Sequence, residues 1–412
     1  MRFKVQTTNR ERFIWNMVGS MSNALSSFAL LTIVTRLNGV EDAGLFSIAF
    51  STAQLLTTIS CFETRSIQAT DVKGELDFKD YFTFRVVTCC IMMFAALGFV
   101  FYNDYHGSDA TLIILISLYK AIDGISDSYQ GMFQQQNRID LSGKALGFRV
   151  ILSTIGFTLI LAATHNLVLA GGIMVIISVI FIYNFDRALS VYFSKAKISF
   201  NFSKMKFLFW QCLPLFIGSF MLSYVINASK YAIEKYSTNA VQTYYGFLLM
   251  PAFVINLFSL FAFRPMMTTL AISWEKKDFK NFMKIIYRSF FWILFLTIGA
   301  VLGAYLLGIY ILNIISGENL SPYRLELCII MLGGGLNALI TVFYYVLTIM
   351  RKQGLILLSY TIGFISSLVS APLLVRSMGI TGATIAYGLP MLLITIFMAI
   401  FMFCQLRKHC ED

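Results

Sequence analysis

Charged residues are scarce in this chain of 412 residues. Only 13% of the residues are Asp, Glu, Lys or Arg, whereas 58% are hydrophobic and 39 are phenylalanine. A soluble globular domain carries roughly 25% charged residues, because water must solvate its surface. A chain with about half that fraction cannot cover such a surface. The composition therefore excludes a water-soluble domain and favours a protein embedded in a lipid bilayer.

Several motifs of enzymes are also absent. The sequence has no Walker A loop, no GxGxxG after a strand, no HExxH and no GxSxG, and its seven cysteines include no CxxC pair. Nothing therefore indicates an ATP site, a catalytic centre or a metal or disulfide framework. The three histidines, His106, His165 and His409, fall in loops or in the tail, so none is placed to relay a proton through the membrane. We expect no catalytic residue, bound metal or cofactor.

Long apolar runs fill the chain instead. A membrane-spanning helix takes about 20 apolar residues, and short turns separate runs of this length along the whole sequence. We predict an all-α polytopic membrane protein with about twelve transmembrane helices. The predicted spans are 13–35, 43–63, 81–102, 110–134, 146–164, 167–186, 207–231, 241–263, 285–312, 323–350, 354–375 and 381–405.

The positions of Lys and Arg predict the orientation of these spans. With the N-terminus inside the cell, alternate loops and both ends carry most of the 32 basic residues, as the positive-inside rule requires. We therefore predict that both termini are cytoplasmic. The net charge of +11 follows from this topology, and without a nucleic-acid-binding module it does not indicate a nucleic acid as partner.

The longest central polar stretch divides the spans into six and six. We predict two six-helix bundles, the N-terminal one formed by residues 1–198 and the C-terminal one by residues 199–412. A weak internal repeat supports this division, since Arg65 at the end of the second span has a counterpart in Arg264 at the end of the eighth. Two repeats of six spans have the same orientation, so an axis along the membrane normal should relate them.

The fourth span carries polar side chains on one face. Lys120, Asp123, Asp127, Gln130 and Gln134 project within an arc of about 80° on a helix. Each charge that faces lipid costs roughly 2.5–3.5 kcal/mol on insertion scales, so these side chains must face water or each other. Lys120 and Asp123, three residues apart, can form a structural salt bridge. Alternatively, the stripe lines a cavity that binds a substrate or a coupling cation.

Asp123 and Asp127 are expected to be the only acidic residues well inside a span, so they are the candidates for coupling to H⁺ or Na⁺. Weaker polar stripes occur in other spans. Each of these alone is better explained by hydrogen bonds between helices, but together they predict polar faces that line a shared interior. The candidate polar residues of this cavity are Asn16, Asn23, Gln54, Asp123, Asp127, Gln130, Gln134, Asn227 and Asn337.

Basic residues in or near the polar faces are candidates for binding an anionic substrate, because guanidinium and ammonium groups suit phosphate oxygens. For three of them, Arg65, Arg149 and Arg264, topology or snorkelling is the better explanation when each is taken alone. Lys120 differs from these by its depth in the membrane. The candidate cavity cations are Arg36, Arg65, Lys120, Arg149, Lys230 and Arg264.

Three segments resemble motifs of a known family. Residues 36–46, RLNGVEDAGLF, resemble the R-x-x-G-x-E-D-x-G-x-F junction between the first two spans of polysaccharide flippases. Residues 123–144, DGISDSYQGMFQQQNRIDLSGK, resemble the fourth-span motif of Wzx-type exporters from bacterial capsule and O-antigen clusters. Residues 244–265 are similar to the eighth span of these exporters. In length and number of spans, the resemblance covers essentially the whole chain.

The resemblance implies the fold of the multidrug/oligosaccharidyl-lipid/polysaccharide (MOP) exporter superfamily, with two six-helix bundles in a MATE-like V shape. It implies that an undecaprenyl-diphosphate-linked oligosaccharide repeat unit crosses the bacterial cytoplasmic (inner) membrane by alternating access, for O-antigen (lipopolysaccharide) or capsule biosynthesis. The implied partners are membrane lipid, a polysaccharide polymerase and glycosyltransferases. The family motifs map onto Arg36, Gly39, Glu41, Asp42, Gly44, Asp123, Gln130, Gly131 and Gln134.

Two other functions compete with a flippase that performs no covalent chemistry. A multidrug or small-molecule cation antiporter of the same superfamily would need more acidic than basic groups in its interior, and here the predicted interior cations outnumber the acids. A membrane polymerase or ligase usually carries a large outer loop with catalytic residues. The predicted outer loops, such as 103–109 and 313–322, are too short for that.

Overall fold

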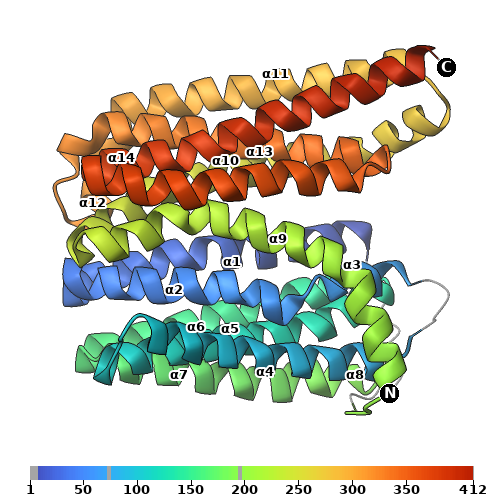
Figure 1. Cartoon of the computed structure of the whole chain (residues 1–412). Coiled ribbons are helices and arrows are strands. Elements are labelled where there is room, and N and C mark those ends of the chain that lie inside the picture. The colour runs from blue at the N-terminus through green and yellow to red at the C-terminus, as the bar shows by residue number, and fades with distance from the viewer. Residues whose placement is uncertain (1–7, 72–75, 194–196, 412) are drawn as a thin grey trace. The chain divides into compact units, whose positions relative to one another are not determined.

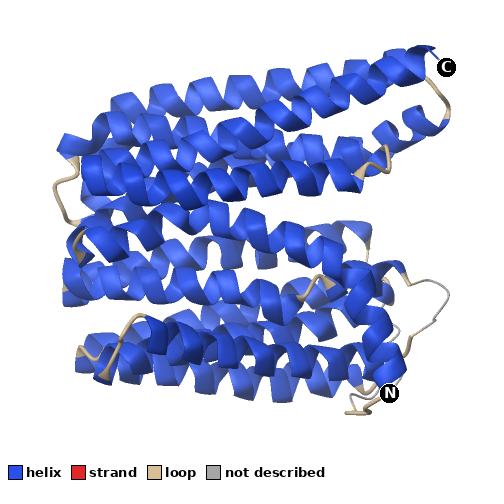
Figure 2. Ribbon diagram, in the orientation of Figure 1, coloured by secondary structure: helices blue, strands red, loops and turns tan. Residues whose placement is uncertain are grey.

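The computed structural model consists of helices joined by short loops and turns in the part of the chain that it describes (Figures 1 and 2). It describes residues 8–71, 76–193 and 197–411, except for the side chains at 9, 69, 70, 256–269, 271 and 407–411. Within these ranges no residue lies in a β-strand. The all-α fold class predicted from the sequence is therefore confirmed.

The elements are α1 (Asn9–Asn38), α2 (Val40–Cys61), α3 (Thr64–Thr70), α4 (Phe78–Tyr102), α5 (Gly107–Gln135), α6 (Ile139–Thr164), α7 (Leu167–Phe181), the π-helical turn η1 (Ile182–Arg187), α8 (Ala188–Ser190), α9 (Phe202–Tyr236), α10 (Asn239–Glu275), α11 (Phe279–Gly303), the π-helical turn η2 (Ala304–Gly308), α12 (Ile309–Ser316), the 3₁₀ turn η3 (Ser321–Tyr323), α13 (Arg324–Ile349) and α14 (Gln353–Glu411).

Among the described residues, nine helical segments are long and apolar enough to cross a bilayer. The last of these, in α14, contains a non-helical residue, Gly379, with φ 56° and ψ −128°, so two helices meet there. This break lies between the predicted spans 354–375 and 381–405. The helices α5 and α10, with 29 and 37 residues, also have the length of a span. The structure is therefore consistent with about twelve spans, and the chain is a multi-pass membrane protein.

The second predicted span, 43–63, differs from the structure at its end. Phe62 and Glu63 have φ angles of 42° and 53°, so the helix stops and α3 begins at Thr64. The ring of Phe62 is buried and stacks on Phe216 of α9 at a centroid distance of 4.3 Å. We attribute the break to this burial, because packing of a large side chain can offset the cost of a left-handed backbone. Arg65 consequently lies in α3, directly after this break, near the end of the apolar segment Val40–Gln68.

The chain forms two compact units, Met1–Phe220 and Met221–Asp412, which we call unit 1 and unit 2. The boundary between them lies within α9. In unit 1 the helix α5 contacts α2, α3, α4, α6 and α7, and in unit 2 the helix α13 contacts α10, α11 and α14. Each unit is therefore built around one central helix. The division at residues 198 and 199 stays a prediction.

The junction between α1 and α2 explains part of the R-x-x-G-x-E-D motif. Gly39 has a φ of 94°, a backbone conformation that side chains with a Cβ rarely adopt, so the chain can turn sharply there. The Asn38 side chain donates to Asp42 Oδ2 and to the carbonyl oxygen of His165, each at 2.8 Å. His165 Nδ1 in turn lies 3.1 Å from the carbonyl oxygen of Leu37. The motif thus joins the α1–α2 turn to the α6–α7 turn.

Three consecutive glycines in α13 allow close helix packing. A Cβ atom would come within 2.5 Å of Tyr387 if it were added to Gly333, within 2.8 Å of Ala252 if added to Gly334, and within 2.4 Å of Thr297 if added to Gly335. These three neighbours belong to α14, α10 and α11. Small residues let membrane helices approach closely. The glycine run therefore serves close helix packing in unit 2.

The replacement Gly334→Ala is expected to destabilise unit 2 by about 1–3 kcal/mol, because the added methyl group overpacks the contact with Ala252. Gly299→Ala in α11 is the matched control, since no neighbouring atom lies within 4 Å of a Cβ there. Alanine favours a helix over glycine, so the control should be neutral or slightly stabilising. Thermal unfolding of both variants in detergent tests this. Equal unfolding temperatures for the two variants would contradict the packing argument.

Candidate functional site

Charged side chains meet around the central helix of unit 1. Because α5 turns once in 3.6 residues, Lys120, Asp123 and Asp127 lie on one face of this helix. Arginines from three neighbouring helices, α3, α4 and α6, reach the two aspartates. We call the following six residues the α5 charge network: Arg65, Arg85, Lys120, Asp123, Asp127 and Arg149.

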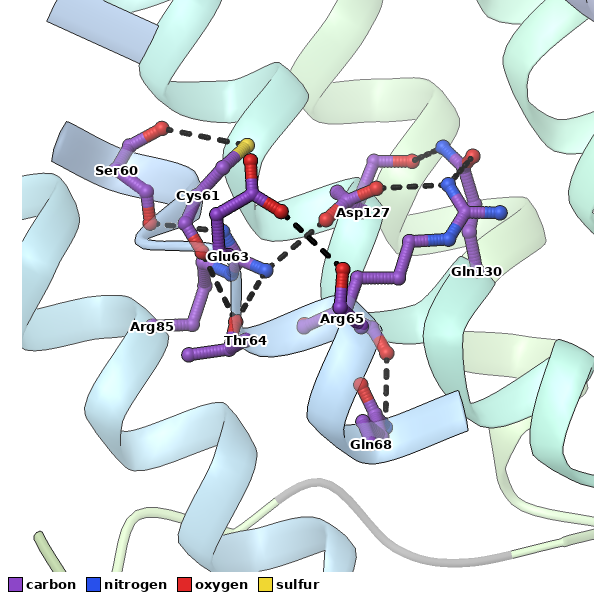
Figure 3. A network of polar contacts seen from close by, with 12 residues as sticks. Ser60, Cys61, Glu63, Thr64, Arg65, Gln68, Arg85, Asp127 and Gln130 are labelled. Atoms are coloured by element: carbon purple, nitrogen blue, oxygen red, sulfur yellow. Dashed lines mark hydrogen bonds and ion pairs between the residues drawn. The ribbon is translucent and has the colours of Figure 1, made fainter. Parts of the chain in front are cut away.

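Asp127 is shared by two arginines. Its Oδ1 accepts a hydrogen bond from Arg65 Nη1 at 2.8 Å, and its Oδ2 accepts one from Arg85 Nη2 at 2.9 Å. In Figure 3 the two arginines reach the carboxylate from opposite sides. Arg65 also donates to Gln130 Oε1 at 3.2 Å and to Gln134 Oε1 at 3.1 Å. One carboxylate thus holds α3 and α4 against α5 by charge-assisted hydrogen bonds.

Arg85 is fully buried in unit 1. Its Nη1 donates to the carbonyl oxygen of Ser60 at 2.8 Å, and its Nη2 also donates to Thr64 Oγ1 at 2.6 Å. These bonds connect α4 to the end of α2 and the beginning of α3 (Figure 3). A buried guanidinium is stable only when it is paired and hydrogen-bonded. Arg85 meets this condition through Asp127 and the break between α2 and α3.

Asp123 is shared by two cations in the same way. Lys120 Nζ lies 3.0 Å from Asp123 Oδ2, and Arg149 Nη1 donates to Asp123 Oδ1. Lys120 is 4% exposed, Arg149 is fully buried, and the Lys120 ammonium lies 4.8 Å from the ring centroid of Phe50 in α2. The predicted salt bridge between Lys120 and Asp123 is therefore present. Lining of a cavity by Lys120 stays a proposal.

A third acidic residue, Asp186, lies buried next to this network. It belongs to the π-helical turn η1, and its Oδ2 accepts a hydrogen bond from Ser126 Oγ of α5 at 2.6 Å. Gln130 Nε2 donates to the same hydroxyl at 3.3 Å. Asp186 is therefore a further buried acid beside Asp123 and Asp127, which were the candidates for coupling to a cation. Asp186 was overlooked because it is the last residue of the predicted span 167–186, where a polar end would be expected.

The basic residues predicted as cavity cations have different surroundings. Arg65, Lys120 and Arg149 belong to the α5 charge network. Complete burial of Arg149 in α6 corrects the expectation that topology or snorkelling explains it. Arg36 is exposed in the last turn of α1, Lys230 is half-buried in α9, and the side chain of Arg264 lies outside the described residues.

The predicted polar residues are distributed over both units. Gln130, Asn227 and Asn337 are buried, Asn16, Asp123, Asp127 and Gln134 are half-buried, and Asn23 and Gln54 are exposed. The structure brings Gln130 and Gln134 together with Asp127 through Arg65. In unit 2 the Asn227 amide donates to the carbonyl oxygen of Ser223 in its own helix at 2.9 Å. A shared interior for these residues stays a prediction.

Arg85 is the residue of the network that the sequence analysis missed. It lies four residues inside the predicted span 81–102 and is not among the predicted cavity cations. That position was the available signal, because an arginine inside a span needs a partner. Its pairing with Asp127 depends on the break at Phe62, which no motif in the sequence indicates.

The α5 charge network has a charge of +2 when all six members are ionised, because four cations face two aspartates. Across the described residues, no three His, Cys, Asp or Glu side chains lie together as ligands for a metal ion. The buried groups are held by hydrogen bonds between helices. Such an arrangement can fix the helices of unit 1, present positive charge and respond to a change of protonation.

The sequence comparison finds a relative in capsule biosynthesis. Over 332 residues the chain is 26% identical to the capsular polysaccharide biosynthesis protein CapF of Staphylococcus aureus, and the match covers 78% of this chain and 81% of that protein. No family model matches the chain.

Solved structures with the same fold are transport proteins. The lipid II flippase MurJ in an inward closed conformation matches with a TM-score of 0.71 and 13% identity, over 93% of this chain and 86% of that chain. A multidrug resistance MATE family transporter of the MOP superfamily, in an inward-facing conformation, matches with a TM-score of 0.62 and 12% identity, over 98% and 97%. The chain has the fold of MATE transporters and MurJ. The MATE-like fold class predicted from the sequence is confirmed.

This MATE-like fold agrees with the resemblance to polysaccharide flippases seen in the motifs. The relative CapF and the structural neighbour MurJ both support that resemblance. The structural matches have low sequence identity, so they concern the fold. Substrate and mechanism depend on the site, because one fold can serve several functions.

Proposed function

We propose that the chain is a flippase that moves a polyprenyl-diphosphate-linked oligosaccharide, of the undecaprenyl type, across the cytoplasmic membrane by alternating access. The product would serve the synthesis of a cell-surface polysaccharide such as capsule or O-antigen. The observation that carries this proposal is the match to CapF over most of both chains. The fold shared with a lipid II flippase supports it, because lipid II is itself a lipid-linked sugar.

The charge of unit 1 favours an anionic substrate over a cationic drug. Four cations and two aspartates form the α5 charge network. A site for a drug cation would be expected to have more acid than base, since like charges repel. The excess of positive charge near α5 suits the diphosphate group, whose oxygens accept hydrogen bonds from guanidinium and ammonium groups.

The diphosphate would contact cations that have solvent access. Arg65 is 31% exposed at its side chain while it binds Asp127, so its remaining surface is accessible. Arg36 and Lys230, which the sequence analysis proposed as phosphate-binding groups, are exposed and half-buried, respectively. The buried cations Arg85 and Arg149 would position the network without contacting substrate. In this proposal no covalent bond forms or breaks, and an H⁺ or Na⁺ gradient drives the cycle.

A reconstitution experiment tests the proposal. The purified chain is placed in proteoliposomes with a fluorescent undecaprenyl-diphosphate oligosaccharide, and a membrane-impermeant quencher reports the fraction in the outer leaflet. We expect the chain to speed the exchange between leaflets at least tenfold over protein-free vesicles. A lipid-linked monophosphate sugar serves as the control substrate.

Cells provide the second arm of this test. Deletion of the gene should cause lipid-linked repeat units to accumulate in the inner leaflet, while export of cationic dyes stays unchanged. If dye export falls and polysaccharide reaches the surface normally, the chain is a cation antiporter. If polymer length alone changes while lipid-linked units still cross, a polymerase is indicated.

A further inference from the structure

Asp186 differs in its partners from the two aspartates of the α5 charge network. Asp123 and Asp127 each bind two cations, whereas Oδ2 of Asp186 binds a neutral hydroxyl, that of Ser126. Its Oδ1 has no hydrogen-bond partner among the described residues. An ionised carboxylate without a bound cation is very costly in an apolar interior, while the neutral acid costs much less. The surroundings of Asp186 therefore favour the binding of a proton.

The backbone at Asp186 is also unusual. The turn η1 is π-helical over Ile182–Arg187, and Asp186 is its buried residue. Turns of this kind widen a helix locally and often occur at functional sites. In this chain the turn points a single carboxyl group at α5, next to Ser126.

Few charged or titratable groups face Asp186. From α6, the charge of Arg149 acts on Asp186. From α5, the neutral phenol of Tyr129 lies near enough to be affected by the charge of Asp186. The packed helices α7 and α8 contain no titratable residue in their sequences. The neighbouring Arg187 is exposed and lies over the ring of Tyr183, 5.0 Å from its centroid. Arg149 is therefore the cation that responds to the charge of Asp186.

Arg149 has the donors for such a response. Its Nη1 is bound to Asp123, but its Nε and Nη2 are buried and have no hydrogen-bond partner in the described part of the chain. Unpaired buried donors cost free energy. Loss of a proton from Asp186 creates an anion that can attract these donors, and the pull on Arg149 would weaken its bond to Asp123.

Hydrogen bonds also connect Asp186 to the solvent-exposed part of the α5 charge network. Ser126 binds Asp186, Gln130 binds Ser126, Arg65 binds Gln130, and the same Arg65 binds Asp127. Arg65 and Asp127 have side chains that are 31% and 19% exposed, whereas Asp186 is fully buried. A change of charge at Asp186 therefore has a continuous hydrogen-bonded connection to groups that water reaches.

We propose that Asp186 is a proton-binding site and that its protonation state is transmitted to the α5 charge network through Ser126 and Arg149. The reaction is the reversible addition of one proton to one carboxylate. Asp123 and Asp127, the coupling candidates of the sequence analysis, serve instead as fixed anions for their cations. The part of this inference that concerns transport rests on the proposed function, while proton binding itself does not.

Infrared difference spectroscopy tests proton binding directly. The purified full chain in lipid is titrated with acid, and the carbonyl stretch of protonated carboxyl groups is recorded. We expect one distinct band, separate from the absorption of the exposed carboxyl groups, that rises on acidification, is lost in Asp186→Asn and is shifted in Asp186→Glu. Asp104→Asn, which removes an exposed carboxylate in the loop after α4, should retain the band. A band that persists in Asp186→Asn, or no titrating band in the wild-type chain, overturns the proposal.

A variant that leaves the carboxyl group in place covers the case in which Asp186→Asn does not fold. Ser126→Ala removes the hydroxyl that donates to Asp186. The carbonyl stretch of the protonated acid should then shift to higher frequency, because it loses a hydrogen bond. An unchanged frequency in Ser126→Ala contradicts the assignment to Asp186.

The transport arm separates this inference from the proposed function. Leaflet exchange is measured in proteoliposomes with and without a pH gradient. The gradient should change the exchange rate of the wild-type chain, and this change should be at least tenfold smaller in Asp186→Asn. If neither chain moves the lipid-linked oligosaccharide, the proposed function fails while the infrared result stands. If Asp186→Asn responds as the wild type does, proton coupling at this site is refuted.

Discussion

Asp127→Asn is expected to destabilise unit 1 by about 3–5 kcal/mol, since it leaves buried charge without a counterion. The acid holds both Arg65 and Arg85, and Arg85 has no contact with solvent. Arg65→Gln should cost less, because Asp127 keeps Arg85 and the Arg65 position is partly exposed. Thermal or denaturant unfolding of the purified variants shows which of the two is less stable.

A double variant separates charge from packing at this position. Asp127→Leu combined with Arg85→Met replaces the buried ion pair with apolar side chains of similar size. Such a replacement often leaves the stability of a protein unchanged or raises it. We expect the double variant to be more stable than Asp127→Asn. If it is equally unstable, the hydrogen bonds of Arg85 to Ser60 and Thr64 matter more than its charge.

The second large effect concerns activity. We expect the triple variant Lys120→Met, Asp123→Leu and Arg149→Met to fold. Its rate of leaflet exchange should be at least tenfold lower than that of the wild-type chain. Apolar residues can replace a buried ionic group without loss of stability. Charges inside the membrane are costly, so their presence here indicates a function beyond stability. Unfolding temperature and flipping rate, measured on the same preparation, show whether stability and activity separate.

A matched neutralisation provides the control for the triple variant. Arg138 and Asp140 form an ion pair at the beginning of α6, with an N···O distance of 2.9 Å, apart from the α5 charge network. Arg138→Gln with Asp140→Asn should keep the flipping rate within about twofold, because both partners of this ion pair come from the beginning of α6 and neither belongs to the α5 charge network. Full activity of the triple variant would show that its charges are structural.

The general architecture could be predicted from the sequence for a simple physical reason. Each membrane-spanning helix needs an apolar run of about 20 residues, so the composition and the length of the apolar runs indicate an all-α membrane protein. The break in α14 was predicted between two runs and occurs at Gly379. The salt bridge between Lys120 and Asp123 was one of the two interpretations of the polar stripe in the fourth span, because residues three apart share a helix face.

The partners of the site could not be predicted in the same way. The bonds from Arg85 and Arg65 to Asp127 connect residues 42 and 62 positions apart in the chain. Which helices become neighbours depends on tertiary packing, which hydrophobic periodicity does not encode. Asp186 shows the same limit, because its hydrogen bond reaches Ser126, 60 positions away.

The ties between α1 and α6 limit how unit 1 can deform. At one end, Asn38 fastens the α1–α2 turn to His165 beyond α6, and near the other end the ring of Trp15 lies 5.5 Å from that of Phe148. Separating these helices would break the extensive packing between them. In the proposed transport cycle we therefore expect α1 and α6 to move together as one rigid body, and slow hydrogen exchange should mark both helices alike.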